Sequence, residues 1–271
     1  MSQIHPTAII ETGAKIGNHT VVEPYAIIKS NVIIGDHCKI KSHVYLDGNT
    51  TIGDHVTIWP FTSIGAKPQD LKYKGEKTFV TIGNHTEIRE CVTINSSCGE
   101  GQVVKVGDNC LVMACCHIAH NCVIGNHVIM SNGVLLAGHV EVGDFAIIGG
   151  MTPLHQFVRV GSYAMVGGMS RVTHDIPPFT IGGNVPFHIA GLNMVGLKRH
   201  NFDLSLRQQL TKAFKLTYRS GYTLSEAIAK IEQEVESSPS IRHWVDFCKK
   251  TKRGLIDLQN KIPKKMYSTN T

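Results

Sequence analysis

The feature that most constrains the fold of this chain is an aliphatic residue at every sixth position from residue 4 to residue 172. Of the 29 positions in this series, 26 are Ile, Leu, Val or Met, and the exceptions are Asp70, Glu76 and Glu100. An α-helix repeats every 3.6 residues and a strand every two, so neither produces a period of six. A fixed repeat of this kind predicts a solenoid.

A longer period of 18 residues is superimposed on the first. Glycine follows the aliphatic residue in three groups, with a step of 18 within each group: Gly17, Gly35 and Gly53; Gly65 and Gly83; Gly107, Gly125, Gly143 and Gly161. Each coil therefore has three six-residue sides, and the stacked aliphatic residues point inward. The sequence predicts a mainly β fold, a three-sided parallel β-helix. The polar segments 67–78 and 96–105, which interrupt the series, are expected to be two external loops.

The composition changes after Val172, where Pro177 and Pro178 leave the repeat, since proline cannot serve an interior strand ladder. Helical patterns with capping or termination signals follow. These segments are 203–220, 223–236 and 240–250. We therefore expect two domains, a β-helix over 1–189 that carries both loops and a small C-terminal helical domain over 190–271.

Composition and charge exclude several classes of protein. The N-terminus lacks a signal-peptide pattern and no apolar run is long enough to cross a membrane, so a cytoplasmic protein without a transmembrane segment is expected. No basic tract with interleaved aromatic residues suggests nucleic-acid binding. The net charge is +6, and the C-terminal end is basic. This end is either a solvated surface or a binding site for an acidic protein. Its residues are Lys249, Lys250, Lys252, Arg253, Lys261, Lys264 and Lys265.

The eight cysteines show no CxxC pairs. Reduced thiols therefore fit better than a disulfide framework or a zinc site. Four of them lie within the repeats and are expected to act as small buried hydrophobic residues. They are Cys110, Cys115, Cys116 and Cys122.

Histidines fall into two sets. Five occupy the same corner of the repeat and are interpreted as structural: His19, His37, His55, His85 and His127. The others depart from this pattern, and the 18-residue coil predicts how they stack. Counting 18 residues per coil stacks Gly138 and then Gln156 on His120 in the next two coils, and it stacks His139 on Asn121. One corner should therefore gather His117, His120, Gly138, His139, His155 and Gln156. A histidine there suits a general base and a glycine N–H suits an oxyanion. The spacing alone does not distinguish this site from a histidine ladder without chemistry.

The repeated hexads, with Gly and then Asp or Asn after the aliphatic residue, resemble the hexapeptide-repeat transferases. Nine further segments, spread over nearly the whole chain, are similar to the UDP-N-acetylglucosamine O-acyltransferases of lipid A biosynthesis. They are Gln69–Tyr73, Ile88–Ile94, His117–His120, Leu136–His139, Phe145–Thr152, His155–Phe157, Met165–Gly168, Gly196–Arg199 and Tyr218–Gly221.

The resemblance implies a left-handed β-helix and a homotrimer. It implies transfer of a (3R)-hydroxyacyl group from an acyl carrier protein thioester to the 3-hydroxyl of UDP-N-acetylglucosamine, without a metal or other cofactor. By resemblance, His120 is the general base and Gly138 the oxyanion donor. Gly168 matches the position that limits acyl length, which implies a chain of about fourteen carbons. Substrate-binding positions are matched by Asp70, Lys72, His117, His139, His155, Gln156, Asn193 and Arg199.

Three positions depart from the family pattern. Asn121 stands where many members have Asp, while Val195 and His200 stand at positions that are often Glu and Arg. Three other functions are compatible with a repeat of this kind. A zinc carbonic anhydrase on the same fold is disfavoured because its His-x4-His-Gly pattern is absent. A coenzyme A-dependent transferase and a non-catalytic scaffold remain alternatives.

Overall fold

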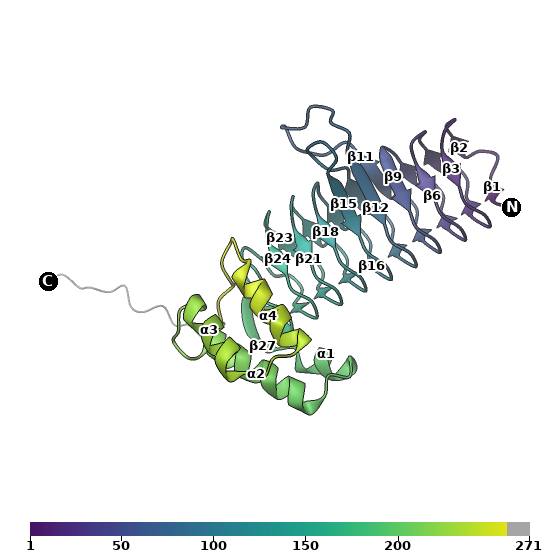
Figure 1. Ribbon diagram of the computed structural model, residues 1–271. Coiled ribbons are helices and arrows are strands. Elements are labelled where there is room, and N and C mark those ends of the chain that lie inside the picture. Colours follow the sequence, from purple (N-terminus) through teal and green to yellow (C-terminus); the bar gives the residue numbers. More distant parts are fainter. Residues whose placement is uncertain (259–271) are drawn as a thin grey trace.

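The repeat folds as a rod of stacked triangular coils with helices at one end, as the computed structural model of residues 1–258 shows (Figure 1). Its strands form three sheets. Sheet A contains β1 (Gln3–Ile4), β4 (Val21–Val22), β7 (Lys39–Ile40), β10 (Thr57–Ile58), β13 (Glu87–Ile88), β16 (Leu111–Val112), β19 (Ile129–Met130), β22 (Ile147–Ile148), β25 (Met165–Val166), β26 (Thr180–Gly183) and β27 (His188–Leu192).

The other two sides of the rod have eight strands each. Sheet B contains β2 (Ile9–Ile10), β5 (Ile27–Ile28), β8 (Tyr45–Leu46), β11 (Ser63–Ala66), β14 (Thr93–Asn95), β17 (His117–Ile118), β20 (Leu135–Leu136) and β23 (Pro153–Leu154). Sheet C contains β3 (Lys15–Ile16), β6 (Ile33–Ile34), β9 (Asn49–Ile52), β12 (Phe79–Ile82), β15 (Val103–Val106), β18 (Val123–Ile124), β21 (Glu141–Val142) and β24 (Arg159–Val160). The mainly β class and the parallel coil predicted from the period are confirmed.

The aliphatic residue of each side points into the core. Ile28, Ile58, Ile94, Ile118 and Leu136 have no solvent-exposed surface. Apolar burial of this kind contributes roughly 25 cal/mol for each Å² removed from water, and it is repeated on every side of every coil. The core is thus one continuous column along the rod, and it fixes the height at which every corner residue lies.

The two external loops leave the rod between sheets B and C, and each loop lengthens its coil by whole sides. Ile52 pairs with Ile82, where an uninterrupted coil would bring Asp70, so the first loop adds the length of two sides. Ile82 pairs with Val106, where an uninterrupted coil would bring Glu100, so the second loop adds the length of one side. This explains why the six-residue series keeps its phase across both loops.

The insertions also correct the predicted glycine groups. Gly83 stacks between Gly53 and Gly107, and it does not stack on Gly65. The expected second loop is shorter than predicted, since Val103–Lys105 are part of β15 and pair with β12. Of the four cysteines expected to be buried, Cys115 is instead exposed, because it occupies an outward corner position with a φ of 61°.

The recurring Gly-Asp/Asn pair has a local cause at the corner between sheets C and A. Asp54 Oδ1 accepts a hydrogen bond from the N–H of Asp36 in the preceding coil, at 2.8 Å. A Cβ on Gly35 would lie only 2.3 Å from the same Oδ1 atom. Glycine therefore leaves room for the carboxylate of the next coil, and this carboxylate ties the two corners together.

The C-terminal part contains four helices, α1 (Met194–Arg199), α2 (Leu204–Tyr218), α3 (Leu224–Glu234) and α4 (Pro239–Lys249). The Thr223–Glu226 capping box at the start of α3 is present as predicted. Helix α1 was not predicted. Strand β27 runs across the proposed domain boundary at residue 189, since it pairs with β26 and extends sheet A to Leu192. Within residues 1–258 no helix is long and apolar enough to cross a membrane.

Candidate functional site

The corner between sheets B and C, called here the B–C corner, carries most of the side chains that the sequence singles out. It consists of 67–78, 96–102, 119–122, 137–140 and 155–158 in the coils that matter here. Both external loops belong to it. The loops are bound to each other, because the Gly101 N–H donates to the Lys77 carbonyl oxygen at 2.8 Å. The corner is thus a partly enclosed edge and not an open turn.

His120 and Gly138 are in direct contact at this corner, as the 18-residue coil predicts. A Cβ on Gly138 would lie 2.4 Å from His120 Cε1 and 2.5 Å from Nε2. The imidazole ring therefore rests against the glycine backbone. The next residue continues the stack, because the His139 N–H donates to the His120 carbonyl oxygen at 3.0 Å.

Asn121 fixes the tautomer of His120. The Asn121 amide makes two hydrogen bonds to the Cys98 backbone, in which Oδ1 accepts from N–H at 3.1 Å and Nδ2 donates to the carbonyl at 3.0 Å. The amide oxygen therefore faces His120 Nδ1, at 2.9 Å. Because that oxygen only accepts, Nδ1 carries the proton and Nε2 carries the lone pair.

Asp70 of the first loop faces this lone pair. Its Oδ2 atom lies 3.6 Å from His120 Nε2, and the His120 and Asp70 side chains are 16% and 24% exposed. The other oxygen of Asp70 accepts from the Lys72 N–H at 2.9 Å, so the carboxylate is held within its own loop. A carboxylate in this position stabilises an imidazolium that forms when Nε2 takes a proton.

The two neighbouring histidines have shifted pKa values. Burial, with the charge of His120 second, lowers the pKa of both His117 and His139 below the usual value. His117 Nδ1 lies 2.7 Å from Thr93 Oγ1. The lowered pKa values disfavour the charged form of both rings next to His120.

The Gly138 N–H is a free donor inside the corner. Gly138 is buried, and its carbonyl oxygen accepts from the Phe157 N–H at 3.1 Å. Among residues 1–258, no hydrogen bond is found for its N–H. This N–H is therefore available to an acceptor on a ligand.

His155 and Gln156 lie on the same corner one coil further on, as expected, and both are exposed. His155 Nδ1 is 3.1 Å from the Gln156 carbonyl oxygen. The corner therefore carries five of the six expected residues, and the sixth, His117, lies next to it in β17. The corner also gathers Asp70 and Lys72, because both loops open there.

Three predicted residues lie elsewhere on the rod. Gly168 is at the corner between sheets A and B, on the far edge of sheet B. Asn193 and Arg199 lie near the third corner, between sheets C and A, where the Asn193 amide donates to the Tyr163 carbonyl oxygen at 3.0 Å. Asn193 also caps α1 by accepting from the Gly196 N–H, so its side chain has a structural role. The width of sheet C separates these two residues from His120 in the same chain.

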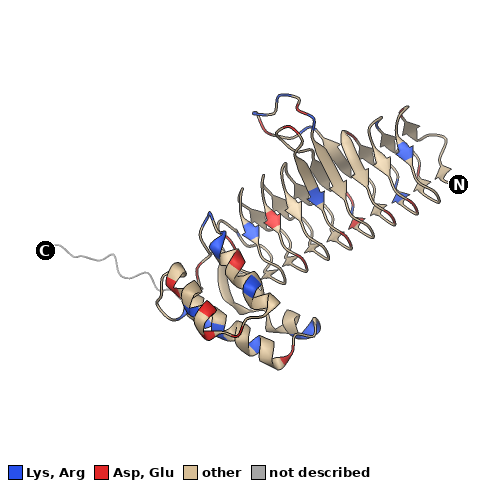
Figure 2. Ribbon diagram, in the orientation of Figure 1, with Lys and Arg blue, Asp and Glu red and all other residues tan. Residues whose placement is uncertain are grey.

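Two hollows lie between the rod and the C-terminal helices. A groove of about 940 Å³ adjoins the B–C corner at Asn121 and His139. Its far wall is basic, and Figure 2 shows Lys and Arg residues on α4 beside the last coils. This wall consists of Lys249, Lys250, Thr251, Lys252 and Arg253, while Lys261, Lys264 and Lys265 lie outside the described residues.

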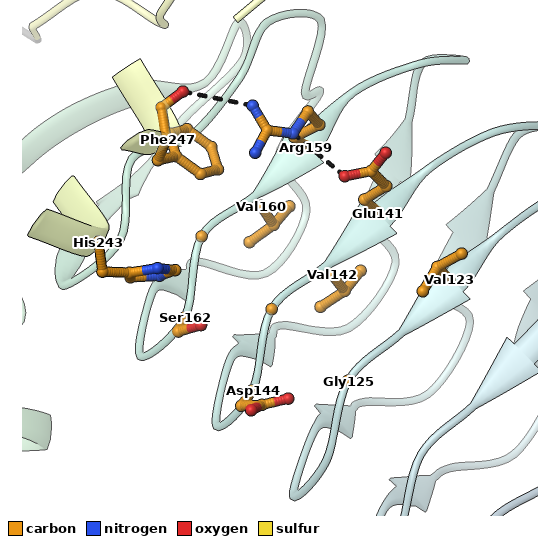
Figure 3. Close-up of a pocket in the computed structure, with 12 residues that line it drawn as sticks. Val123, Gly125, Glu141, Val142, Asp144, Arg159, Val160, Ser162, His243 and Phe247 are labelled. Carbon is orange, nitrogen blue, oxygen red and sulfur yellow. Dashed lines mark hydrogen bonds and ion pairs between the residues drawn. The ribbon is translucent and has the colours of Figure 1, made fainter. Parts of the chain in front are cut away.

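The second hollow, of about 220 Å³, lies further along sheet C, against α4. Figure 3 shows Arg159 spanning it, with hydrogen bonds to Glu141 at 3.1 Å and to the Phe247 carbonyl oxygen at 3.3 Å. The guanidinium also lies 4.3 Å from the centre of the Phe247 ring. Arg159 therefore fastens α4 to the rod and holds one side of the basic groove in place.

Two contributions to the corner were missed by the sequence reasoning. Asn121 was noted only as a departure from a family pattern, and Cys98 was not considered. The side chains of Asp70, Cys98 and His120 form a group of the kind that holds a metal ion. The Cys98 residue lies in a loop outside the six-residue series, so no periodicity pointed to it.

Comparisons with known proteins agree on one family. A family model described as "Udp N-acetylglucosamine O-acyltransferase; Domain 2" matches residues 175–256. A model of the bacterial transferase hexapeptide (six repeats) matches 13–48, 31–66 and 104–138. The first match begins before the domain boundary proposed at residue 190.

Whole-chain relatives carry the same description. The chain is 53% identical, over 94% of its length and 91% of the relative's, to an acyl-[acyl-carrier-protein]–UDP-N-acetylglucosamine O-acyltransferase of Chlamydia muridarum. It is 49% identical to the enzyme of that name from Thermodesulfovibrio yellowstonii, over 94% and 99% of the two chains. A crystal structure of a UDP-N-acetylglucosamine acyltransferase from Bacteroides fragilis matches with a TM-score of 0.91 and 40% identity, over 93% and 99% of the two chains.

Proposed function

The chain belongs to the UDP-N-acetylglucosamine O-acyltransferase family, and on that premise we propose that it catalyses the first step of lipid A biosynthesis. It moves a (3R)-hydroxyacyl group from acyl carrier protein to the 3-hydroxyl of UDP-N-acetylglucosamine. The observation that carries this assignment is the contact between the His120 ring and Gly138, whose N–H has no hydrogen-bond acceptor among residues 1–258.

The proposed mechanism is direct acyl transfer. His120 Nε2 takes the proton of the sugar hydroxyl while the hydroxyl oxygen attacks the thioester carbonyl carbon. The Gly138 N–H donates a hydrogen bond to the carbonyl oxygen and so stabilises the negative charge that develops there. Collapse of the tetrahedral intermediate expels the thiolate of the carrier, which takes the proton back from His120. Because a thioester is already activated, the reaction as proposed uses neither a covalent enzyme intermediate nor a cofactor.

The residues around the base have supporting roles. Asp70, 3.6 Å from Nε2, stabilises the imidazolium form of His120. Asn121 holds the tautomer through Nδ1 but adds no charge, in contrast to the Asp of the family pattern that the sequence resembles. Lys72 is exposed beside Asp70 and is proposed to meet the sugar nucleotide together with it. His117, His139, His155 and Gln156 are proposed to line the substrate site.

The carrier protein is proposed to dock at the basic groove. Acyl carrier proteins are acidic, and the groove wall from Lys249 to Arg253 leads to His139 at the corner. Part of this charge is already engaged, since Lys249 pairs with Glu232 at 2.5 Å. Electrostatic attraction of this kind acts mainly on the rate of encounter, and it weakens as salt is added. The use of an acyl group bound to acyl carrier protein as the donor also supports a location in the cytoplasm.

The acceptor site is proposed to lie between two copies in a homotrimer. The proposed nucleotide contacts Asn193 and Arg199 lie at a different corner from His120, so one chain does not complete the site. The outer faces of sheets B and C also carry exposed aliphatic side chains, including Val123 at 43% and Leu135 at 47%. A three-sided rod with apolar faces is suited to pack against copies of itself.

A complementation experiment tests the shared site. Chains carrying His120→Ala and chains carrying Arg199→Ala are each expected to be nearly inactive. Co-expressed in equal amounts, they should regain activity at about a quarter of the sites, because random assembly brings the two intact halves together with that frequency. Absence of any recovery in co-purified mixed trimers would contradict the shared site, and full activity of Arg199→Ala alone would contradict its role.

A transfer assay tests the reaction and the proposed acyl-length position together. Purified protein is given acyl carrier protein loaded with chains of different length, and either UDP-N-acetylglucosamine or its 3-amino analogue. We expect O-acylation, with a chain of about fourteen carbons preferred over shorter ones, because Gly168 has no side chain at the far edge of sheet B. Gly168→Met should shift the preference to shorter chains by at least ~10-fold, since one methylene in an apolar site is worth roughly 1–3 kcal/mol. An unchanged length profile would contradict the role of Gly168, and equal use of coenzyme A thioesters would favour the alternative donor.

A further inference from the structure

Three side chains with metal-binding atoms converge at the B–C corner, and they come from three separate segments. Asp70 is in the first loop, Cys98 in the second, and His120 at the turn after β17. One carboxylate oxygen, the thiol sulfur and one ring nitrogen all lie within 4.8 Å of one another, and all three residues are partly buried. Within residues 1–258 this is the one group of three or more such side chains.

The separations approach those of a tetrahedral zinc site. Zinc bonds of about 2.0 Å to nitrogen and oxygen and about 2.3 Å to sulfur place neighbouring ligand atoms roughly 3.3–3.6 Å apart. Asp70 Oδ2 and His120 Nε2 are already 3.6 Å apart. All separations in the group are within 4.8 Å, so none of them has to close by more than about 1.3 Å to fit the same geometry, and both Asp70 and Cys98 lie in loops.

Hydrogen bonds from Asn121 orient His120 and hold the backbone of Cys98 at the proposed metal site. Metal-bound histidine usually donates its second ring N–H to a protein oxygen, and His120 Nδ1 faces Asn121 Oδ1 at 2.9 Å. The same Asn121 amide holds the Cys98 backbone through two hydrogen bonds.

We propose that Asp70, Cys98 and His120 bind Zn²⁺, and that the bound ion inhibits the enzyme. A donor set of sulfur, nitrogen and oxygen selects zinc over magnesium or calcium, which prefer oxygen ligands only. The ion occupies the Nε2 lone pair of His120 and the carboxylate of Asp70. Binding itself is independent of the proposed function, whereas inhibition rests on it, because the same lone pair is the proposed base.

The test measures zinc binding without substrates and transfer activity with them. Purified trimer, stripped with chelator, is titrated with zinc chloride against a chromophoric competitor. We expect one ion per chain, and Cys98→Ser should weaken binding at least ~100-fold, since even a residue that only supports a metal ligand is worth 10–100-fold. In the assay, zinc should inhibit the wild type, and Cys98→Ser should resist zinc when its activity is compared with its own activity in the absence of zinc. Magnesium chloride should neither bind nor inhibit.

The matched control is Cys115→Ser, which replaces an exposed cysteine at another corner. This variant should bind zinc as the wild type does. Loss of zinc affinity in Cys115→Ser, or unchanged affinity in Cys98→Ser, would overturn the proposed site. Zinc binding that depends on Cys98 but leaves transfer activity untouched would overturn inhibition, and it would count against His120 as the base.

Discussion

Replacing His120 with alanine is expected to lower the turnover number at least ~100-fold, because a positioned general base contributes about 10²–10⁴-fold. The imidazole is 16% exposed and its Nε2 atom faces Asp70, and alanine has no group that accepts a proton at this position. The loss should appear in kcat, measured with saturating acyl carrier protein substrate and UDP-N-acetylglucosamine. Binding of the nucleotide and the oligomeric state should stay as in the wild type.

His127→Ala is the matched control for this variant. His127 stacks on Phe145 at the corner between sheets C and A, with ring centres 4.5 Å apart, and it is exposed. Its removal takes an equivalent ring from a residue with no proposed role, two coils before Tyr163, which the proposed nucleotide contact Asn193 meets. Turnover should remain within about twofold of the wild type. A His120→Ala enzyme with near-normal turnover would refute the proposed mechanism, whatever the control shows.

The fold could be predicted from the sequence because the repeat converts residue number into position. Between Val106 and Val172 no insertion interrupts the 18-residue coil, so the contact of His120 with Gly138 follows by counting. The same reasoning failed at Gly65 and Gly83, where the first loop, as long as two sides of a coil, shifts the side on which the series resumes. A loop whose length is a multiple of six residues leaves the aliphatic positions in phase. The shift to another side of the coil is therefore not visible in the six-residue series.

The other residues of the candidate site could not be predicted from the repeat. Asp70 lies far ahead of His120 in the chain, in a loop without a repeat, and only the resemblance to a family suggested that it belongs to the site. Asn121 and Cys98 are held by an amide–backbone pair, which no periodicity encodes. Asn193 and Arg199 were placed in the site by resemblance as well. Because they lie at a different corner from His120 within one chain, they would reach the site from a second chain of the proposed homotrimer.

Gly138→Ala is expected to have an effect of similar size, and it separates two reasons for a glycine at this position. The alanine Cβ would lie 2.4–2.5 Å from His120 ring atoms, well inside van der Waals contact. The φ angle of Gly138 is not positive, so the backbone itself accepts alanine. The ring must therefore move, and kcat should fall about 100-fold because the base is displaced while the N–H of residue 138 is kept. Gly191→Ala, where a Cβ meets no atom within 4 Å, is the matched control and should leave activity unchanged.

A double-variant cycle distinguishes displacement of the base from damage to the oxyanion donor. In the His120→Ala background the added methyl group has room, since the ring it meets is gone. If Gly138→Ala acts only through His120, the double variant should have the activity of His120→Ala alone, within about twofold. A further loss of about 10²–10³-fold in the double variant would instead mean that the methyl group disturbs the N–H at residue 138. Full activity of Gly138→Ala, with the fold intact by circular dichroism, would show that the close contact with His120 plays no part in catalysis.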